Sequence, residues 1–221
     1  MLKKTKDKSA PGLSGFTYTF FKDFWAFFGD ILTNAFNEAY NNDRIPEFMS
    51  RGVISLLPKG DKDRSFLKNW RPITLLECPY KLLSGVLAAR LNSVINDLVH
   101  PVQKGFVPDR NIAENSRTFY DILDYAKRNK VGGTAIVLDY EKAFDTLSHA
   151  YFEEVLNFFG FGENFIKWIR ICLKDFFAST THADNISRSF PVVFRLGGAP
   201  GKAIRYRHPF LHWQLRFSVL R

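Results

Sequence analysis

The spacing of apolar positions predicts a chain that is mostly helical. Over residues 16–40, apolar side chains recur every three or four positions, which is the spacing of one face of an α-helix. The same spacing returns over residues 79–99, 112–127, 150–159 and 164–177. Pro101 beyond the second segment and Gly132-Gly133 beyond the third are typical of helix ends. We therefore expect five helices.

Three short segments have the composition of strands. Residues 51–59 are rich in β-branched and apolar side chains, and the charged residues 60–64 after them are typical of a loop. Residues 70–76 should also be extended, because Pro72 keeps Arg71 out of helical geometry. Residues 134–138 are continuously apolar, which indicates a buried strand with Asp139 at its end. Together with the helices, these segments predict an α+β fold.

Composition and charge indicate a class of partner. The 221 residues are 46% hydrophobic, ample for a core, and carry a net charge of +9 that attracts phosphate backbones or anionic membranes. A basic solvated surface without a partner is an equally good interpretation of the charge. Two distant cysteines provide no disulfide framework, which favours an intracellular location in cytoplasm or nucleus. No apolar run approaches the roughly twenty residues that span a bilayer, so we expect no membrane partner.

Asp139 is the first candidate for chemistry. A carboxylate at the end of a buried strand is costly unless a cation compensates it. Magnesium would do so, and phosphoryl transfer by two metal ions requires hard oxygen ligands on a rigid element. An aspartate after a strand is, however, as often a helix cap as a metal ligand. Asp139 alone therefore leaves both interpretations open.

The order of five motifs is more specific than any one of them. They are Ser9–Phe16, Ile54–Asp63, Asn69–Leu76, Gln103–Phe106 with Arg110 and Asn115, and Leu138–Asp145. This succession resembles the reverse transcriptases of LINE-type, non-long-terminal-repeat retrotransposons over about residues 9–196. Group II intron and retron enzymes share the Asp139 motif and are a weaker alternative.

The resemblance implies a fragment of a right-hand polymerase, helix-rich and with an incomplete palm sheet. Residues 1–133 would form the fingers and the template-contact region, and residues 134–196 the start of the palm. The fragment's partners would be an RNA template, a DNA primer and deoxynucleoside triphosphates. Its oligomeric state is not indicated by the sequence.

Individual roles follow from the same resemblance. Asp139 matches the first of three aspartates that hold two Mg²⁺ ions and is the expected catalytic residue. Phe144 matches the aromatic residue that excludes a 2′-hydroxyl, although it could be an ordinary core phenylalanine. Lys59 and Arg71 match the cations that bind the triphosphate, although each could be a solvated surface charge.

A further set of four residues matches the segment that lies along template and primer: Gln103, Gly105, Phe106 and Arg110. The glycine would permit close backbone approach, and the arginine would contact a phosphate. A plain turn after Pro101 is the alternative.

The last part of the sequence departs from the family pattern. The Gln-Gly-Asp-x-x-Ser-Pro segment and the later pair of adjacent aspartates are not recognisable in residues 197–221. Codons that encode residues 201–217 can, in a neighbouring reading frame, encode amino acids of the missing family motifs. We therefore expect a frameshifted tail from about residue 197. Met1 also lies just before the first motif, whereas an endonuclease usually precedes the polymerase in this family. We therefore expect that the fragment neither binds Mg²⁺ stably nor catalyses synthesis. A non-catalytic nucleic-acid-binding module and a non-functional pseudogene product are the alternatives.

Overall fold

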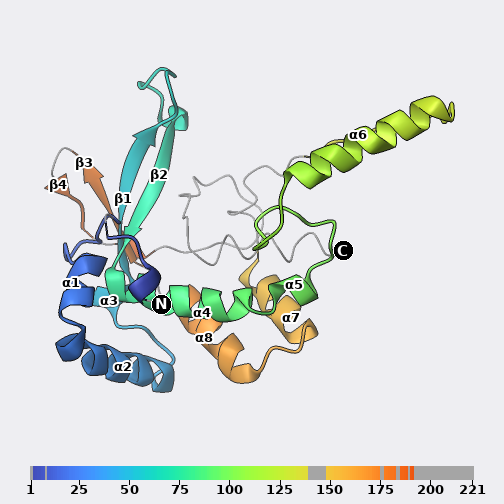
Figure 1. Cartoon of the computed structure of the whole chain (residues 1–221). Coiled ribbons are helices and arrows are strands. Elements are labelled where there is room, and N and C mark those ends of the chain that lie inside the picture. Colours follow the sequence, from blue (N-terminus) through green and yellow to red (C-terminus); the bar gives the residue numbers. More distant parts are fainter. Residues whose placement is uncertain are drawn as a thin grey trace.

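The computed structural model describes residues 2–7, 9–138, 148–174, 177–182, 185–188 and 190–191. Within these ranges, a small sheet rises from a layer of helices (Figure 1). The chain is α+β, as the sequence predicts. None of the described helices is both long and apolar enough to cross a membrane.

The sheet is built around β1 (Arg51–Pro58). Strand β2 (Trp70–Leu76) pairs with it antiparallel, in a register that runs from Gly52 opposite Leu76 to Pro58 opposite Trp70. The sequence predicts both strands. On its other edge, β1 pairs in parallel with β3 (Phe177–His182), which β4 (Asn185–Ile186) and β5 (Phe190–Pro191) join antiparallel. These last three strands are not predicted, because they are short and their pairing depends on contacts far along the chain.

The helices lie mainly where the apolar spacing predicts them, but two predicted helices are broken. The α-helices are α1 (Tyr18–Asp23), α2 (Trp25–Asn41), α3 (Glu47–Ser50), α4 (Cys78–Asn92), α5 (Ile95–Leu98), α6 (Ala113–Arg128), α7 (His149–Phe158) and α8 (Glu163–Leu173), and the short 3₁₀ helices are η1 (Leu2–Lys4) and η2 (Leu67–Asn69).

Tertiary contacts decide where the predicted helices end. The helix expected over residues 16–40 breaks at Phe24, and the break brings the Phe20 and Phe28 rings to 5.3 Å between centroids. The helix expected over residues 79–99 ends at Asn92 and resumes as α5. The helix expected over residues 164–177 ends at Leu173, because Phe177 already pairs with β1.

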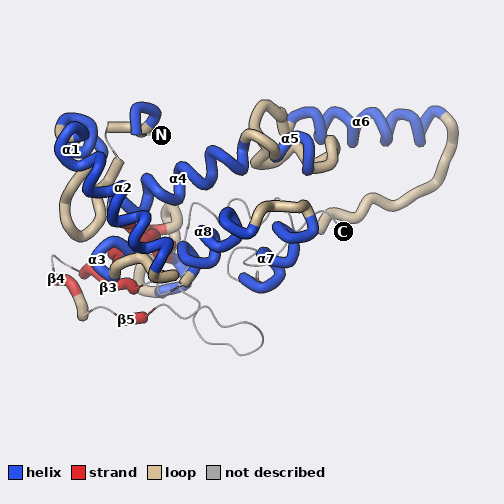
Figure 2. Tube along the Cα trace, turned by 90° about the horizontal axis from the view of Figure 1, so that it is seen from below, coloured by secondary structure: helices blue, strands red, loops and turns tan. Residues whose placement is uncertain are grey.

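Helix α4 lies at the centre of the core, beside α8 (Figure 2). Its Tyr80, Leu87 and Leu91 are almost fully buried, as are Phe152 of α7 and Ile166 of α8. The Tyr80 hydroxyl donates to the carbonyl oxygen of Cys172 at 2.5 Å, and burial raises the pKa of Tyr80 well above its usual value. Both cysteines are free and buried, in agreement with the expected absence of a disulfide framework.

The N-terminal segment is attached to the start of α4. The backbone N–H and the hydroxyl of Ser14 both donate to the buried Glu77 carboxylate, at 2.9 and 2.5 Å. The Lys81 ammonium donates to the carbonyl oxygen of Ala10 at 2.8 Å. Gly12 passes so close that a Cβ there would lie 2.7 Å from the Glu77 backbone nitrogen. The first motif is therefore packed against the element that follows β2.

The strand predicted over residues 134–138 is wrong for this structure. These residues have no regular secondary structure, and Ile136, Val137 and Leu138 are 78%, 89% and 79% exposed. An apolar run becomes a buried strand only when neighbouring strands and helices cover it. In the described part of the sheet, β2 and β3 occupy both edges of β1, so the run has no place beside it. Helix α6, which precedes the run, extends away from the other helices and buries none of its residues (Figure 1).

Candidate nucleotide and nucleic-acid interface

The β1–β2 hairpin places Lys59 and Arg71 on one face. Arg71 lies opposite Leu57, and the Lys59 backbone N–H donates to the Asn69 carbonyl oxygen at 2.8 Å, which extends the pairing by one step. Side chains alternate between faces along a strand, and paired residues share a face. Lys59 and Arg71 are therefore diagonal neighbours, for which the typical separation is about 7–8 Å. The hairpin brings together two residues that are twelve positions apart in the sequence.

The loop between the two strands is held by its own hydrogen bonds. The Asp63 carboxylate accepts from the Ser65 backbone N–H and hydroxyl at 2.9 and 2.8 Å, which lowers the pKa of Asp63 below its usual value. The Asn69 amide donates to the Asp63 carbonyl oxygen at 2.7 Å. The Trp70 indole N–H donates to the carbonyl oxygen of Arg64 at 2.8 Å. The loop thus has a defined shape although all of residues 60–68 are exposed.

The same hairpin carries a concentrated positive charge. Residues 59–71 contain five lysines or arginines and two aspartates. The Lys59 ammonium donates to the Lys68 carbonyl oxygen at 2.5 Å, which aligns its side chain along the end of the hairpin. The Arg71 side chain belongs to an exposed residue of β2. Such an arrangement can neutralise a polyphosphate from one side.

Arg110 is held by hydrogen bonds within its own segment. Its guanidinium donates to the carbonyl oxygens of Asn96, Val99, His100 and Gln103 and to the Asn96 side chain, at 2.7 to 3.1 Å. Arginine has five N–H groups, and these bonds engage all of them. Four of the acceptors are carbonyl oxygens within or just after α5. The predicted phosphate contact of Arg110 remains a prediction, and this geometry argues instead for a role in holding the segment together.

The other three residues of this segment line or support a small loop. The Gln103 amide donates to the Gly105 carbonyl oxygen at 3.1 Å. A Cβ on Gly105 would make only ordinary contacts at 3.8 Å or more, so the fold itself does not require glycine there. Phe106 is 53% exposed and has a φ of 62°, an uncommon backbone conformation for a bulky residue. Gly105, Phe106 and Arg110 line an open hollow of about 490 Å³, together with Lys104 and Ile112.

The two residues predicted for catalysis and sugar selection, Asp139 and Phe144, lie outside the described residues. Among the residues that the structure does describe, no group of three or more His, Cys, Asp and Glu side chains could hold a metal ion. The donor chemistry of Asp139 nevertheless fits magnesium, since a carboxylate is a hard oxygen ligand.

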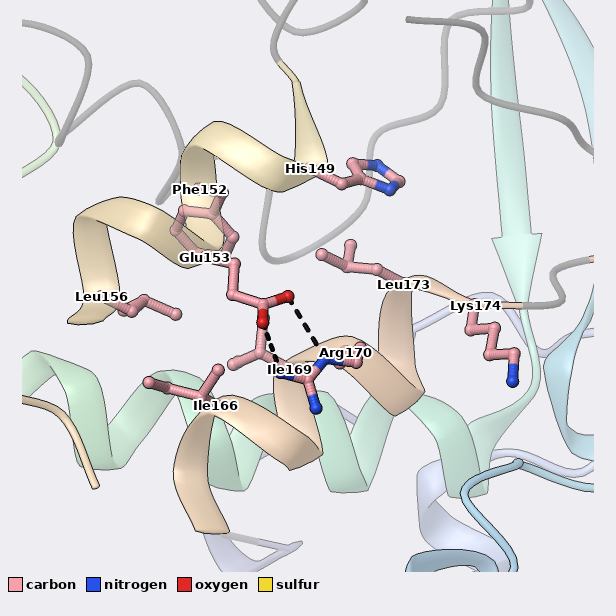
Figure 3. Close-up of a pocket in the computed structure, with 9 residues that line it drawn as sticks. All are labelled: His149, Phe152, Glu153, Leu156, Ile166, Ile169, Arg170, Leu173 and Lys174. Atoms are coloured by element: carbon pink, nitrogen blue, oxygen red, sulfur yellow. Dashed lines mark hydrogen bonds and ion pairs between the residues drawn. The ribbon is translucent and has the colours of Figure 1, made fainter. Parts of the chain in front are cut away.

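A second hollow, of about 310 Å³, lies between α7 and α8 (Figure 3). Its lining is apolar apart from His149, Glu153, Arg170 and Lys174. Glu153 accepts from Arg170 through both carboxylate oxygens, with Nε at 3.2 Å from Oε2, and this pairing lowers the pKa of Glu153. Burial lowers the pKa of His149. The Glu153–Arg170 pair joins the two helices, and none of the predicted site residues within the described ranges lines this hollow.

The sequence analysis does not predict that Asn69 and Trp70 support the loop. A sequence feature that could indicate this role is nevertheless present, since Trp70 and Pro72 flank Arg71 and residues 69–76 form one motif. The attachment of Ser14 to Glu77 has no local signal, because the two residues are 63 positions apart.

Comparison with known proteins shows the family of the chain. The family model for reverse transcriptase (RNA-dependent DNA polymerase) matches residues 57–200, which is more than half of the chain. The chain belongs to this family and is a reverse transcriptase domain of retrotransposon origin, of the LINE type.

Three relatives illustrate the relationship. The chain is 35% identical over 202 residues to the transposon TX1 uncharacterized 149 kDa protein of Xenopus laevis, which covers 90% of the chain and 15% of that protein. It is 32% identical over 121 residues to the retrovirus-related Pol polyprotein from type-1 retrotransposable element R2 of Popillia japonica, covering 55% and 17% respectively. It is 32% identical over 103 residues to the corresponding polyprotein from type-2 element R2DM of Drosophila melanogaster, covering 47% and 10%. The chain thus spans less than a fifth of each relative.

Proposed function

We propose that this chain forms the fingers and the start of the palm of an RNA-directed DNA polymerase. Residues 1–133 are the fingers and template-contact region, and residues 134–196 begin the palm. The observation that carries the proposal is the shared face of Lys59 and Arg71 on a self-supported basic hairpin. Within the proposal, the ligand of this face is the triphosphate of an incoming deoxynucleotide.

The chemistry of the site follows from these charges. Negative charge develops on the phosphoryl oxygens during transfer, and cations that are already in place stabilise it without reorganisation. Arg71 can contact two oxygens at once through its planar guanidinium, whereas Lys59 acts as a point charge. The carbonyl of Lys68 keeps the Lys59 ammonium at the end of the hairpin. Together they would orient the triphosphate against the primer end.

Asp139 and Phe144 complete the proposed site. Asp139 would hold Mg²⁺, which supplies Lewis-acid stabilisation of the transferring phosphoryl group when bound. Phe144 would exclude a 2′-hydroxyl by its bulk. Gln103, Gly105 and Phe106 would lie along the template and primer, while Arg110 would hold this segment in place through its hydrogen bonds.

The proposal also covers residues 197–221, which we interpret as a tail read in a shifted frame. The family model matches residues 57–200 and so ends close to the start of this tail. The nucleotide sequence beyond codon 196, read in all three frames, tests it. Family motifs present in another frame would support the frameshift, and their absence from every frame would contradict it.

Triphosphate binding tests the central claim. Titration of the chain with a fluorescent deoxynucleoside triphosphate and Mg²⁺ should show affinity that falls on Arg71→Ala and on Lys59→Ala by roughly tenfold each, the usual effect of removing one charge-assisted hydrogen bond. The affinity of Arg71→Lys should lie between that of the wild type and that of Arg71→Ala. Arg117→Ala on α6, which removes one positive charge from an exposed helix, is the control. Equal affinity of all variants would refute the proposed role of the hairpin.

A non-catalytic binding module is the second candidate, because the hairpin is complete without Asp139. Primer extension by a protein that carries this domain with a complete set of palm carboxylates, compared with its Asp139→Ala variant, separates the two functions. Incorporation that depends on Asp139 indicates a polymerase. Triphosphate and nucleic-acid binding without incorporation indicates a module.

A further inference from the structure

Asn69 closes the tip of the β1–β2 hairpin, which projects away from the layer of helices (Figure 1). Its backbone N–H donates to the Phe66 carbonyl oxygen at 2.9 Å, and its own carbonyl oxygen accepts from the Lys59 N–H at 2.8 Å. Its side-chain amide donates to the Asp63 carbonyl oxygen at 2.7 Å. Lys59 and Asn69 are half-buried, whereas residues 60–68 between them are exposed. Asn69 therefore joins the end of β1 to the middle of the loop.

Two successive carbonyl oxygens hold Lys59 at this end of the hairpin. The Asn69 carbonyl accepts from the Lys59 backbone N–H at 2.8 Å, and the Lys68 carbonyl accepts from the Lys59 ammonium at 2.5 Å. The side-chain amide of Asn69 anchors this part of the loop to Asp63. Loss of the amide would therefore leave both carbonyls less well fixed, and with them the Lys59 side chain.

The position of the ammonium matters because a lysine side chain is long and flexible. An anion that binds a side chain already held in place loses less free energy to ordering it. Arg71 differs in this respect, because it lies within β2 and pairs with Leu57 in the sheet. Asn69 should therefore affect binding through Lys59 and not through Arg71.

We propose that Asn69 is a positioning residue of the triphosphate site, whose side-chain amide keeps Lys59 in place for the anion. The identity of that anion rests on the proposed function. The restraint on Lys59 rests on the hydrogen bonds of the hairpin. A residue that only stabilised the chain would show no energetic coupling to Lys59, so the two roles can be separated.

Titration of the whole chain with a fluorescent deoxynucleoside triphosphate and Mg²⁺ tests the proposal. Asn69→Ala keeps both backbone bonds and removes the amide, so affinity should fall by roughly 2- to 10-fold, the usual effect of one neutral hydrogen bond. Asn69→Leu keeps the bulk without the donor and should behave in the same way. Asn129→Ala removes an amide that donates to the Tyr125 carbonyl oxygen at 2.9 Å, and this matched control should bind like the wild type.

Two double-mutant cycles separate positioning from general support of the fold. In a Lys59→Ala background, Asn69→Ala should cause no further loss of affinity, because the ammonium that it positions is gone. In an Arg71→Ala background, it should cause the same loss as in the wild type. An equal further loss in both backgrounds, or wild-type affinity of Asn69→Ala and Asn69→Leu, would overturn the proposal.

Amide hydrogen exchange without ligand measures the restraint on Lys59 directly, since exchange reports local opening. The Lys59 N–H should exchange faster in Asn69→Ala than in the wild type, whereas the amides of α4 should exchange at unchanged rates. Wild-type exchange at Lys59 in Asn69→Ala would overturn the positioning role whatever the affinities. Equal triphosphate affinity of Lys59→Ala, Arg71→Ala and the wild type would instead refute the proposed function.

Discussion

The guanidinium of Arg110 donates to the carbonyl oxygen of Gln103 at 2.9 Å, within a set of five bonds that ties residues 96–110 into one unit. Two residues that the sequence assigns to the same nucleic-acid contact are thus bonded to each other. Arg110 holds the segment through these bonds while it lines the same hollow as Gly105 and Phe106, and Gln103 is one of the residues that it positions.

Arg110→Lys should destabilise the chain and leave the salt dependence of RNA binding unchanged. A lysine ammonium has three donors and no planar fork, so it cannot replace the five bonds. We expect the free energy of unfolding in urea to fall by about 1–3 kcal/mol. Arg117→Lys on the exposed face of α6 is the matched control. The neutral variant Arg110→Gln should also leave the salt slope unchanged. If Arg110 instead contacted a phosphate, this variant would lower the log–log salt slope by roughly 0.7 for a single strand.

Gly12→Ala should loosen the attachment of the N-terminal segment to α4. A Cβ at this position would meet the Glu77 backbone nitrogen at 2.7 Å and its Cα at 2.8 Å, and backbone atoms cannot move aside as a flexible side chain can. Overpacking of this kind costs about 1–3 kcal/mol, measured by denaturant unfolding. Gly132→Ala, where nothing lies within 4 Å, should have little effect. Wild-type stability of Gly12→Ala would show that the segment is not packed against Glu77.

The stability of the chain should fall as the pH drops through the unfolded pKa of His149, about 6.5. Burial lowers the pKa of His149 in the folded chain, so the unfolded chain binds the proton more readily. Stability therefore rises with pH between the lowered folded pKa and the unfolded pKa, and is lost in the reverse direction. Urea unfolding at pH 8, 7, 6 and 5.5 measures the slope.

His149→Asn should reduce this slope, whereas His100→Asn, at an exposed position, is the control. Glu153, Arg170 and Lys174 line the same hollow, and the Glu153–Arg170 pair contributes stability that is lost at lower pH, because the pKa of Glu153 is lowered. The contribution of His149 is lost as the pH falls below about 6.5, whereas the contribution of the Glu153–Arg170 pair is lost only at lower pH, so the two can be measured separately. An unchanged slope in His149→Asn would contradict the role assigned to this histidine.

Phe144→Val should admit ribonucleotides in a protein that carries this domain with a complete set of palm carboxylates. The smaller side chain removes the steric exclusion of the 2′-hydroxyl, so selectivity falls while synthesis continues. Asp139→Ala in the same protein should abolish synthesis, because the carboxylate acts in the transition state. The ratio of kcat/KM for deoxynucleotide and ribonucleotide measures the first effect. A ratio equal to the wild type in Phe144→Val would place the gate elsewhere.

The sequence by itself determined the local elements and the family. Apolar spacing predicts α6 and α7 closely, and the proline and charge patterns predict the two strands of the hairpin. These features depend on residues that are neighbours in sequence, where periodicity and turn chemistry act directly. The order of the motifs is likewise a property of the sequence alone, and it identifies the reverse transcriptase family.

Only the tertiary structure decided which groups meet. The parallel pairing of β1 with β3, the attachment of Ser14 to Glu77 and the exposure of residues 134–138 each depend on partners far away in the sequence. The run at 134–138 shows the reason most clearly, because its composition is that of a buried strand while its burial depends on whether another element covers it. Composition states what a segment can bury, and long-range packing decides whether it does.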